Sequence, residues 1–268
     1  MPENRTPDYT VLDVPEVLLR LFHPRPENGL AASAPGARDL LIPVEDDVVI
    51  GARFHAAAPV APTLLFFHGN GEIVADYDEL APFLVRLGLN FLPVDYRGYG
   101  RSTGVPTVSA MMRDCHVILD FVRNWLPDQG HQGPLMVMGR SLGSASALEL
   151  AAAHPDAVAA LIIESGFAYA GPLLELLGVN PAGLGFQEPE GFRNLDKIRA
   201  YRGPTLIIHA EYDHIIPFSD GRALYDAAGA ADKTLLKIPQ ANHNDLLFQG
   251  FTEYMAAIQS LAQRSRRA

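Results

Sequence analysis

A serine framed by glycines is the strongest chemical signal in this chain. Ser141 lies in Gly139-Arg140-Ser141-Leu142-Gly143, between an apolar run that predicts a strand and an alanine-rich segment that predicts a helix. A sharp turn between the two would expose the serine hydroxyl at a sheet edge, and the glycines would leave room for that turn. The helix start would aim backbone N–H groups, that of Leu142 among them, at an oxyanion. The alternative is a serine that only caps the helix.

The histidines that follow Ser141 are candidates for its general base, because a strand–serine–helix turn is found in folds whose chain order is serine, acid, histidine. There are four: His154, His209, His214 and His243. His154 precedes a proline as a helix C-cap would, and His209 lies inside a predicted strand. His214 directly follows the best acid, so the pair could hardly orient. His243 lies in a polar loop after the last predicted strand, from which we expect it to reach Ser141.

Asp213 is the preferred acid to orient that histidine. It follows a predicted strand, at the carboxyl end where open α/β sheets place ligand sites. Its loop is one strand away from the loop of His243. The rival acids are Glu164, at another strand end, and, more weakly, Glu211 and Asp245.

The loop His68-Gly69-Asn70-Gly71-Glu72 follows another predicted strand. An oxyanion site on such a sheet needs a second N–H donor from this position, and we assign it to the backbone of Asn70, with Leu142 as the first donor. His68 could act as a metal ligand or a base, but we expect it to brace the loop by hydrogen bonds.

Strands and helices alternate from residue 39 onward. The predicted strands are 39–44, 48–55, 63–68, 90–95, 134–139, 158–164, 204–210 and 234–238, and the main helices are 80–87, 107–126, 142–154, 218–229 and 245–264. This alternation predicts an α/β fold with a mostly parallel eight-stranded sheet and helices on both faces. The first two strands form a hairpin that adds an antiparallel edge.

Two segments fall outside this rhythm. Residues 1–38 form an N-terminal extension whose amphipathic part, 14–22, we expect to pack on its own domain, 39–268, rather than on a membrane or a partner. Residues 168–200 predict a small lid, apolar but broken by glycines and prolines. Its large apolar side chains could line an acyl pocket or pack on the domain; they are Leu173, Leu174, Leu176, Leu177, Leu184 and Phe186.

Composition excludes several classes of function. The net charge of -10 argues against nucleic acid as a partner. No Gly-Lys pair for a phosphate loop and no His-Glu-x-x-His zinc motif occurs. Cys115 lies on the apolar stripe of a helix, so we interpret it as a core residue. A single cysteine, no signal-peptide pattern and no apolar run of about 18 residues favour a cytoplasmic protein without a transmembrane segment.

From residue 39 to the C-terminus the sequence resembles the α/β-hydrolase superfamily, and within it the small-cap esterase, thioesterase and peptidase-like branch. The resemblance rests on the Ser141 and His68–Glu72 motifs, on Asp95-Tyr96-Arg97-Gly98-Tyr99-Gly100, on Asp213 and on His243. It implies no cofactor and a small-molecule acyl substrate. It also implies a serine hydrolase that cleaves an ester, thioester or amide through an acyl-enzyme. Acyl transfer on the same residues, or a catalytically silent binding module on this fold, are the alternatives.

Overall fold

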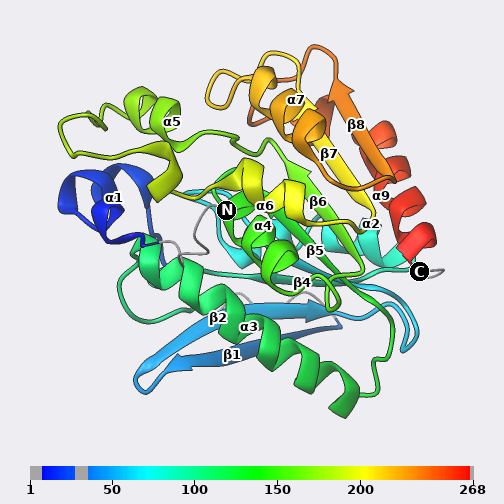
Figure 1. The fold of residues 1–268 in the computed structure, drawn as a ribbon. Coiled ribbons are helices and arrows are strands. Elements are labelled where there is room, and N and C mark those ends of the chain that lie inside the picture. The colour runs from blue at the N-terminus through cyan, green and yellow to red at the C-terminus, as the bar shows by residue number, and fades with distance from the viewer. Residues whose placement is uncertain (1–7, 28–35, 266–268) are drawn as a thin grey trace.

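A twisted eight-stranded sheet forms the centre of the computed structural model, which describes residues 8–27 and 36–265 (Figure 1). The strand order is β1-β2-β4-β3-β5-β6-β7-β8. Strands β3 to β8 run parallel, while β1 and β2 form an antiparallel hairpin at one edge. The strands are β1 (Ala37–Glu45), β2 (Val48–His55), β3 (Thr63–Phe67), β4 (Asn90–Val94), β5 (Leu135–Arg140), β6 (Ala160–Glu164), β7 (Thr205–Ala210) and β8 (Lys233–Ile238). The predicted mostly parallel sheet and its antiparallel edge are confirmed.

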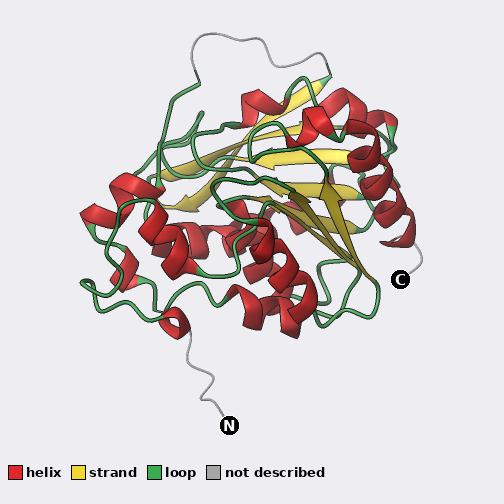
Figure 2. Ribbon diagram, turned by 90° about the horizontal axis from the view of Figure 1, so that it is seen from above, coloured by secondary structure: helices red, strands yellow, loops and turns green. Residues whose placement is uncertain are grey.

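Helices cover both faces of the sheet (Figure 2). They are α1 (Pro15–Leu21), α2 (Ala81–Arg86), α3 (Val108–Asp128), α4 (Gly143–Ala153), α5 (Ala170–Leu176), α6 (Asn194–Ala200), α7 (Phe218–Ala227), α8 (Leu246–Gln249) and α9 (Phe251–Ser265). Side chains alternate along β3, so Leu65 and Phe67 join the apolar cluster under α3 and α4, whereas Leu64 and Phe66 join the cluster under α2 and α9. Strands buried on both faces explain their near-continuous apolar sequences.

The amphipathic N-terminal segment packs on the same chain. Val17 and Leu21 of α1 and the following Phe22 are buried in the cluster beneath α3 and α4. Burying each such side chain stabilises the fold by about 1.5–3 kcal/mol. Residues 1–7 and 28–35 of the predicted extension lie outside the described residues.

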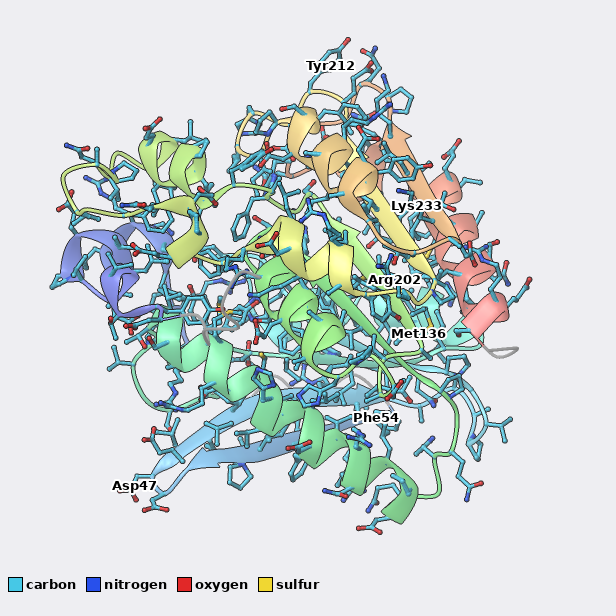
Figure 3. All side chains as sticks on the ribbon, in the orientation of Figure 1. Asp47, Phe54, Met136, Arg202, Tyr212 and Lys233 are labelled. Atoms are coloured by element: carbon cyan, nitrogen blue, oxygen red, sulfur yellow. The ribbon has the colours of Figure 1, made fainter. Side chains whose placement is uncertain are left out.

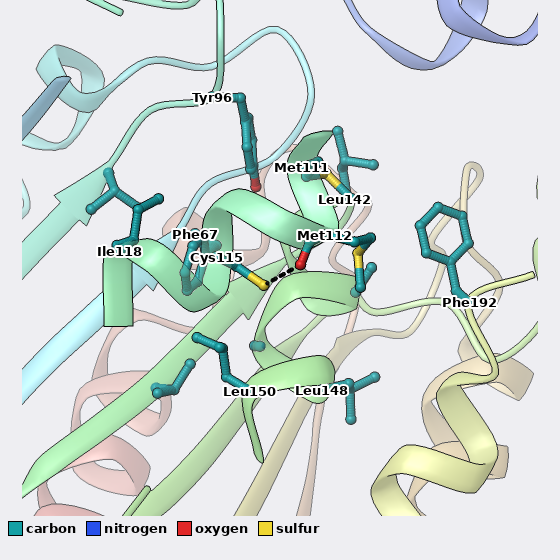
Figure 4. Packing of buried hydrophobic residues seen from close by; sticks show 14 of the residues in the cluster. Phe67, Tyr96, Met111, Met112, Cys115, Ile118, Leu142, Leu148, Leu150 and Phe192 are labelled. Atoms are coloured by element: carbon teal, nitrogen blue, oxygen red, sulfur yellow. Dashed lines mark hydrogen bonds between the residues drawn. The ribbon is translucent and has the colours of Figure 1, made fainter. Parts of the chain in front are cut away.

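Cys115 of α3 lies deep in this cluster, as its place on the helix stripe predicts. Figure 4 shows it between Met112, Ile118 and Leu150, with its Sγ 3.2 Å from the Met112 carbonyl oxygen. Burial raises the pKa of the Cys115 thiol well above its usual value, so the thiol stays protonated. Cys115 is therefore a core residue.

The predicted single C-terminal helix, 245–264, is wrong in one respect, because the chain forms α8 and α9 with a break at Gly250. A Cβ at Gly250 would lie 2.6 Å from two side-chain carbons of Ile238, so only glycine lets the chain pass the end of β8 here. Within the described ranges, no helix is long and apolar enough to cross a membrane.

Candidate active site

Ser141 occupies a strained turn between β5 and α4. Its φ of +50° lies in the left-handed region, which residues with a Cβ rarely adopt. A Cβ on Gly139 would lie 2.2 Å from the carbonyl oxygen of Gly143, and a Cβ on Gly143 would lie 2.1 Å from that of Phe67. Both glycines are therefore required for the turn. This is the backbone shape that holds a serine hydroxyl clear of a sheet edge.

His243 joins Ser141 to Asp213 in one chain of hydrogen bonds. Its Nε2 lies 3.0 Å from the Ser141 Oγ, and its Nδ1 lies 2.7 Å from the Asp213 Oδ2. A carboxylate only accepts hydrogen bonds, so the Nδ1–H of His243 donates to Asp213 and leaves Nε2 to accept the serine proton. The three side chains come from the loops after β5, β7 and β8, at the carboxyl edge of the sheet, and all are buried.

Asp213 is held in its charged form by the loop that carries it. Its Oδ1 accepts hydrogen bonds from the backbone N–H groups of Ile215, at 3.0 Å, and Ile216, at 2.8 Å. Burial raises the pKa of Asp213, but the hydrogen bond and charge of His243, together with these N–H groups, lower it below its ordinary value. The adjacent Tyr212 points into solvent (Figure 3), where 60% of its surface is exposed.

The rival acids lie elsewhere. Glu164 accepts a hydrogen bond from Arg140 at 3.0 Å and another from Tyr254 at 2.7 Å. Glu211 pairs with a surface lysine, and Asp245 accepts from Asn242. Of these four acids, all within the described residues, only Asp213 forms a hydrogen bond with His243.

The other histidines serve different contacts. His154 ends α4 as its C-cap, as predicted. His209 lies in β7, contacts the carbonyl oxygen of Ile216 at 2.8 Å through Nε2, and lies 3.6 Å from the Asp213 Oδ2. His214 is exposed at the surface of the loop. The structure thus brings only His243 to Ser141.

The loop after β3 is fixed from several sides. Asn70 accepts hydrogen bonds from the His23 N–H at 2.8 Å and the Tyr99 hydroxyl at 2.7 Å through its side-chain oxygen. His68 braces the loop as predicted, with Nδ1 2.8 Å from the Gly69 carbonyl oxygen. Across residues 8–27 and 36–265, the backbone N–H groups of Asn70 and Leu142 have no protein acceptor, so both remain available to a ligand.

Comparison with known proteins agrees with this geometry. The family model "Serine aminopeptidase, S33" matches residues 58–180. The chain is 31% identical over 212 residues to human alpha/beta hydrolase domain-containing protein 17B, covering 75% of this chain and 67% of the relative. This chain belongs to the α/β-hydrolase family. An uncharacterized protein of Mycobacterium tuberculosis H37Rv is 30% identical over 217 residues, covering 79% of this chain and 74% of the relative.

Solved structures show the same α/β-hydrolase fold. The Pyrococcus furiosus esterase Pf2001 superimposes with a TM-score of 0.72 at 16% identity, covering 91% of this chain and 96% of the esterase. Est1E from Butyrivibrio proteoclasticus, solved with ferulic acid bound, superimposes with a TM-score of 0.67 at 17% identity, covering 85% of this chain and all of Est1E. At these identities the likeness establishes the fold.

Arg140, which sequence analysis did not single out, connects the loops of this hydrolase. Its Nε donates to Glu164 at 3.0 Å, one terminal nitrogen donates to Glu72, and the other donates to the His243 carbonyl oxygen at 2.9 Å. Glu72 in turn accepts from the Gly69 N–H at 2.7 Å. One guanidinium therefore ties the serine turn to both the histidine loop and the loop after β3. The sequence does hold one sign of this role, because Arg140 is a charged residue at the end of the otherwise apolar strand β5.

Two pockets of the hydrolase border the site. The larger, about 300 Å³, is lined by Phe167, Pro172, Leu173, Leu176, Asp213, His214, Ile215, Ile216, Pro217 and Asp220. The smaller, about 140 Å³, is lined by Tyr77, Leu80, Arg140, Glu164, Asn244, Leu246, Leu247 and Tyr254. In the part of the chain that the structure describes, no group of three or more His, Cys, Asp or Glu is placed to hold a metal ion.

Proposed function

We propose that this α/β hydrolase is a serine hydrolase that cleaves an ester, thioester or amide through an acyl-enzyme on Ser141. The observation that carries the proposal is the hydrogen-bonded chain from Ser141 through His243 to Asp213. The strained serine turn and the two available N–H groups support it as well. One of its structural neighbours, from Pyrococcus furiosus, is named as an esterase, which agrees with ester cleavage.

The proposed reaction follows from these positions. The Ser141 Oγ attacks the acyl carbonyl carbon while the Nε2 of His243 takes its proton. Asp213 holds the imidazole in the required tautomer and stabilises its protonated form. The N–H groups of Asn70 and Leu142 bind the oxyanion. The protonated His243 gives its proton to the leaving group, and then, as a base again, activates the water that releases the acid.

A fluorophosphonate probe tests this proposal directly. We expect it to label Ser141 in the folded protein, with loss of both labelling and ester hydrolysis in Ser141→Ala, by about 10⁴-fold or more. Ser144→Ala is the matched control, because this neighbouring buried serine contacts neither His243 nor Asp213 in the described structure. Folded wild-type protein that resists the probe and hydrolyses no ester would refute the proposal.

The alternatives from sequence are separated by product analysis. Acyl transfer would give the acylated alcohol or amine when such an acceptor is added, whereas hydrolysis gives the free acid. We also propose that the hydrolase acts on a small-molecule substrate. The single cysteine leads us to propose the cytoplasm as the place where it acts.

A further inference from the structure

The predicted lid, residues 168–200, has apolar side chains in two places, the core of the domain and the wall of the larger pocket. Leu174 and Phe186 are buried in the core cluster, where they anchor the segment to the domain. Leu173 and Leu176, in contrast, line the larger pocket, and Leu176 is 56% exposed. An anchored segment that leaves apolar side chains on a pocket wall forms a surface that a ligand could cover.

Apart from the exposed His214, the ionisable side chains that line the pocket already have hydrogen-bond partners. No lysine or arginine lines it, and its two carboxylates are occupied. Asp213 is bonded to His243 and to its own loop, while Asp220 accepts from the Ala168 N–H at 2.8 Å. Burial raises the pKa of Asp220 above its ordinary value. An anionic ligand would meet two acids, and a cationic ligand would find no free partner.

The pocket reaches the proposed catalytic residues at Asp213. One wall is the segment from Asp213 to Pro217, whose first residue binds His243. Another wall is Phe167, three residues after the end of β6. The last residue of β6 is Glu164, and its backbone carbonyl oxygen accepts a 2.9 Å hydrogen bond from the Ser141 N–H. A group attached to the carbonyl on Ser141 could therefore extend into this space.

We infer that this pocket binds the acyl part of the substrate and selects a neutral, apolar acyl chain of medium length, about six to ten carbons. The volume of about 300 Å³ sets the length, since it lies at the small end of ligand pockets and a methylene occupies roughly the ~30 Å³ of a water molecule. The inference rests on the proposed function, and it assigns residues 168–200 the role of a pocket-lining lid.

A panel of p-nitrophenyl esters from two to sixteen carbons tests the inference on the wild-type protein. We expect kcat/KM to rise about three- to fourfold per methylene and to pass a maximum between six and ten carbons. An eight-carbon ester that ends in a carboxylate or an ammonium group should react at least tenfold more slowly than the plain octanoyl ester, because its charge finds no partner.

Variants locate the preference in the structure. Leu176→Trp should shorten the preferred chain by two carbons or more, and Leu173→Ala should lengthen it. Leu41→Trp is the control, because Leu41 on β1 is 57% exposed and lies outside the pocket. A flat chain-length profile with activity that still requires Ser141, or an unchanged maximum in both pocket variants, would overturn the inference alone. Absence of any Ser141-dependent hydrolysis would overturn the proposed function with it.

Discussion

The two pockets that border the site differ in what holds their walls together. An ion pair holds the smaller one: Arg140 and Glu164 line it beside several leucines, and their hydrogen bonds reach Glu72, Tyr254 and the His243 backbone. One wall of the larger one is formed by Leu173 and Leu176 of α5, and the N–H of Ala168, just before this helix, donates to Asp220.

This difference separates positioning from binding. Ion pairs with fixed geometry hold the serine turn and the histidine loop in place. An apolar pocket wall binds the acyl chain of a substrate without directional contacts. Loss of this wall should change the affinity for the substrate and leave the reacting groups aligned. Substitution of Arg140 should therefore lower kcat, whereas substitution of Leu173 or Leu176 should alter the choice of substrate.

The largest effect should come from Asp213, which lines the larger pocket and binds His243. Asp213→Asn keeps an oxygen to accept from the Ile215 and Ile216 N–H groups, so the loop should stay in place. Its amide no longer stabilises a protonated His243 and favours the wrong tautomer. We expect kcat to fall by about 10⁴-fold, measured with the best ester of the panel.

Glu211→Gln is the matched control for Asp213→Asn, because Glu211 lies in the same loop but pairs with Lys237 at the surface. It should keep kcat within twofold. An equal loss in both variants would show that any change in this loop disturbs the site, and that Asp213 has no special role.

Arg140→Ala should have the next largest effect. Without the guanidinium, the histidine loop and the loop after β3 lose their common tie, and a displacement near 1 Å costs about 10²-fold in kcat. KM should change little. Arg140→Lys should recover only part of the rate, because lysine keeps the charge but not the planar set of donors. Arg113→Ala, at an exposed arginine, is the control.

Added guanidinium ions can show whether Arg140→Ala loses activity because its loops are displaced or because the protein is less well folded. The missing side chain borders the pocket of about 140 Å³, so added guanidinium at low millimolar concentration could occupy its place. We expect partial recovery of kcat in Arg140→Ala and none in Asp213→Asn. Circular dichroism and urea unfolding should be measured first, because two carboxylates lose their partner and stability should fall by about 3–5 kcal/mol. A folded variant with wild-type kcat would contradict the positioning role.

Sequence analysis predicted the sheet and the residues that the structure brings to Ser141, because both depend on local patterns. Apolar strand runs that end shortly before Ser141, Asp213 and His243 place all three at one edge of a parallel sheet. The glycines of the serine turn are a local requirement too. The break at Gly250 was missed because it arises from contact with Ile238, a residue of another element.

The Arg140 contacts could not be predicted for the same reason. Its partners come from the loop after β3, the end of β6 and the loop after β8, and no spacing along the chain shows that they meet. Residues 168–200 were hard to predict for a different reason. Leu173 and Leu174 are adjacent and chemically identical, yet one lines a pocket and the other is buried in the core, which only the fold decides.

Glu164→Gln should have the smallest effect on activity and the most informative effect on stability. The glutamine oxygen can still accept from Arg140, its NH2 group can donate to the Tyr254 hydroxyl oxygen, and Glu72 still neutralises the arginine, so we expect kcat/KM to change less than threefold. A loss as large as that of Asp213→Asn would instead identify Glu164, the rival acid, as the partner of His243.

Burial raises the pKa of Glu164 above its ordinary value of 4.5, although Arg140 and Tyr254 oppose this shift. A carboxyl with a raised pKa in the folded state contributes stability below 4.5 that is lost as the pH rises through the folded pKa. Glutamine does not titrate, so the free energy of unfolding of Glu164→Gln, relative to wild type, should improve between pH 4.5 and pH 8. Urea unfolding of both proteins across this range measures the difference. A constant difference would mean that the ion pair with Arg140, and not burial, sets the charge of Glu164. Ionisation of this buried carboxyl would then cost the folded state no stability.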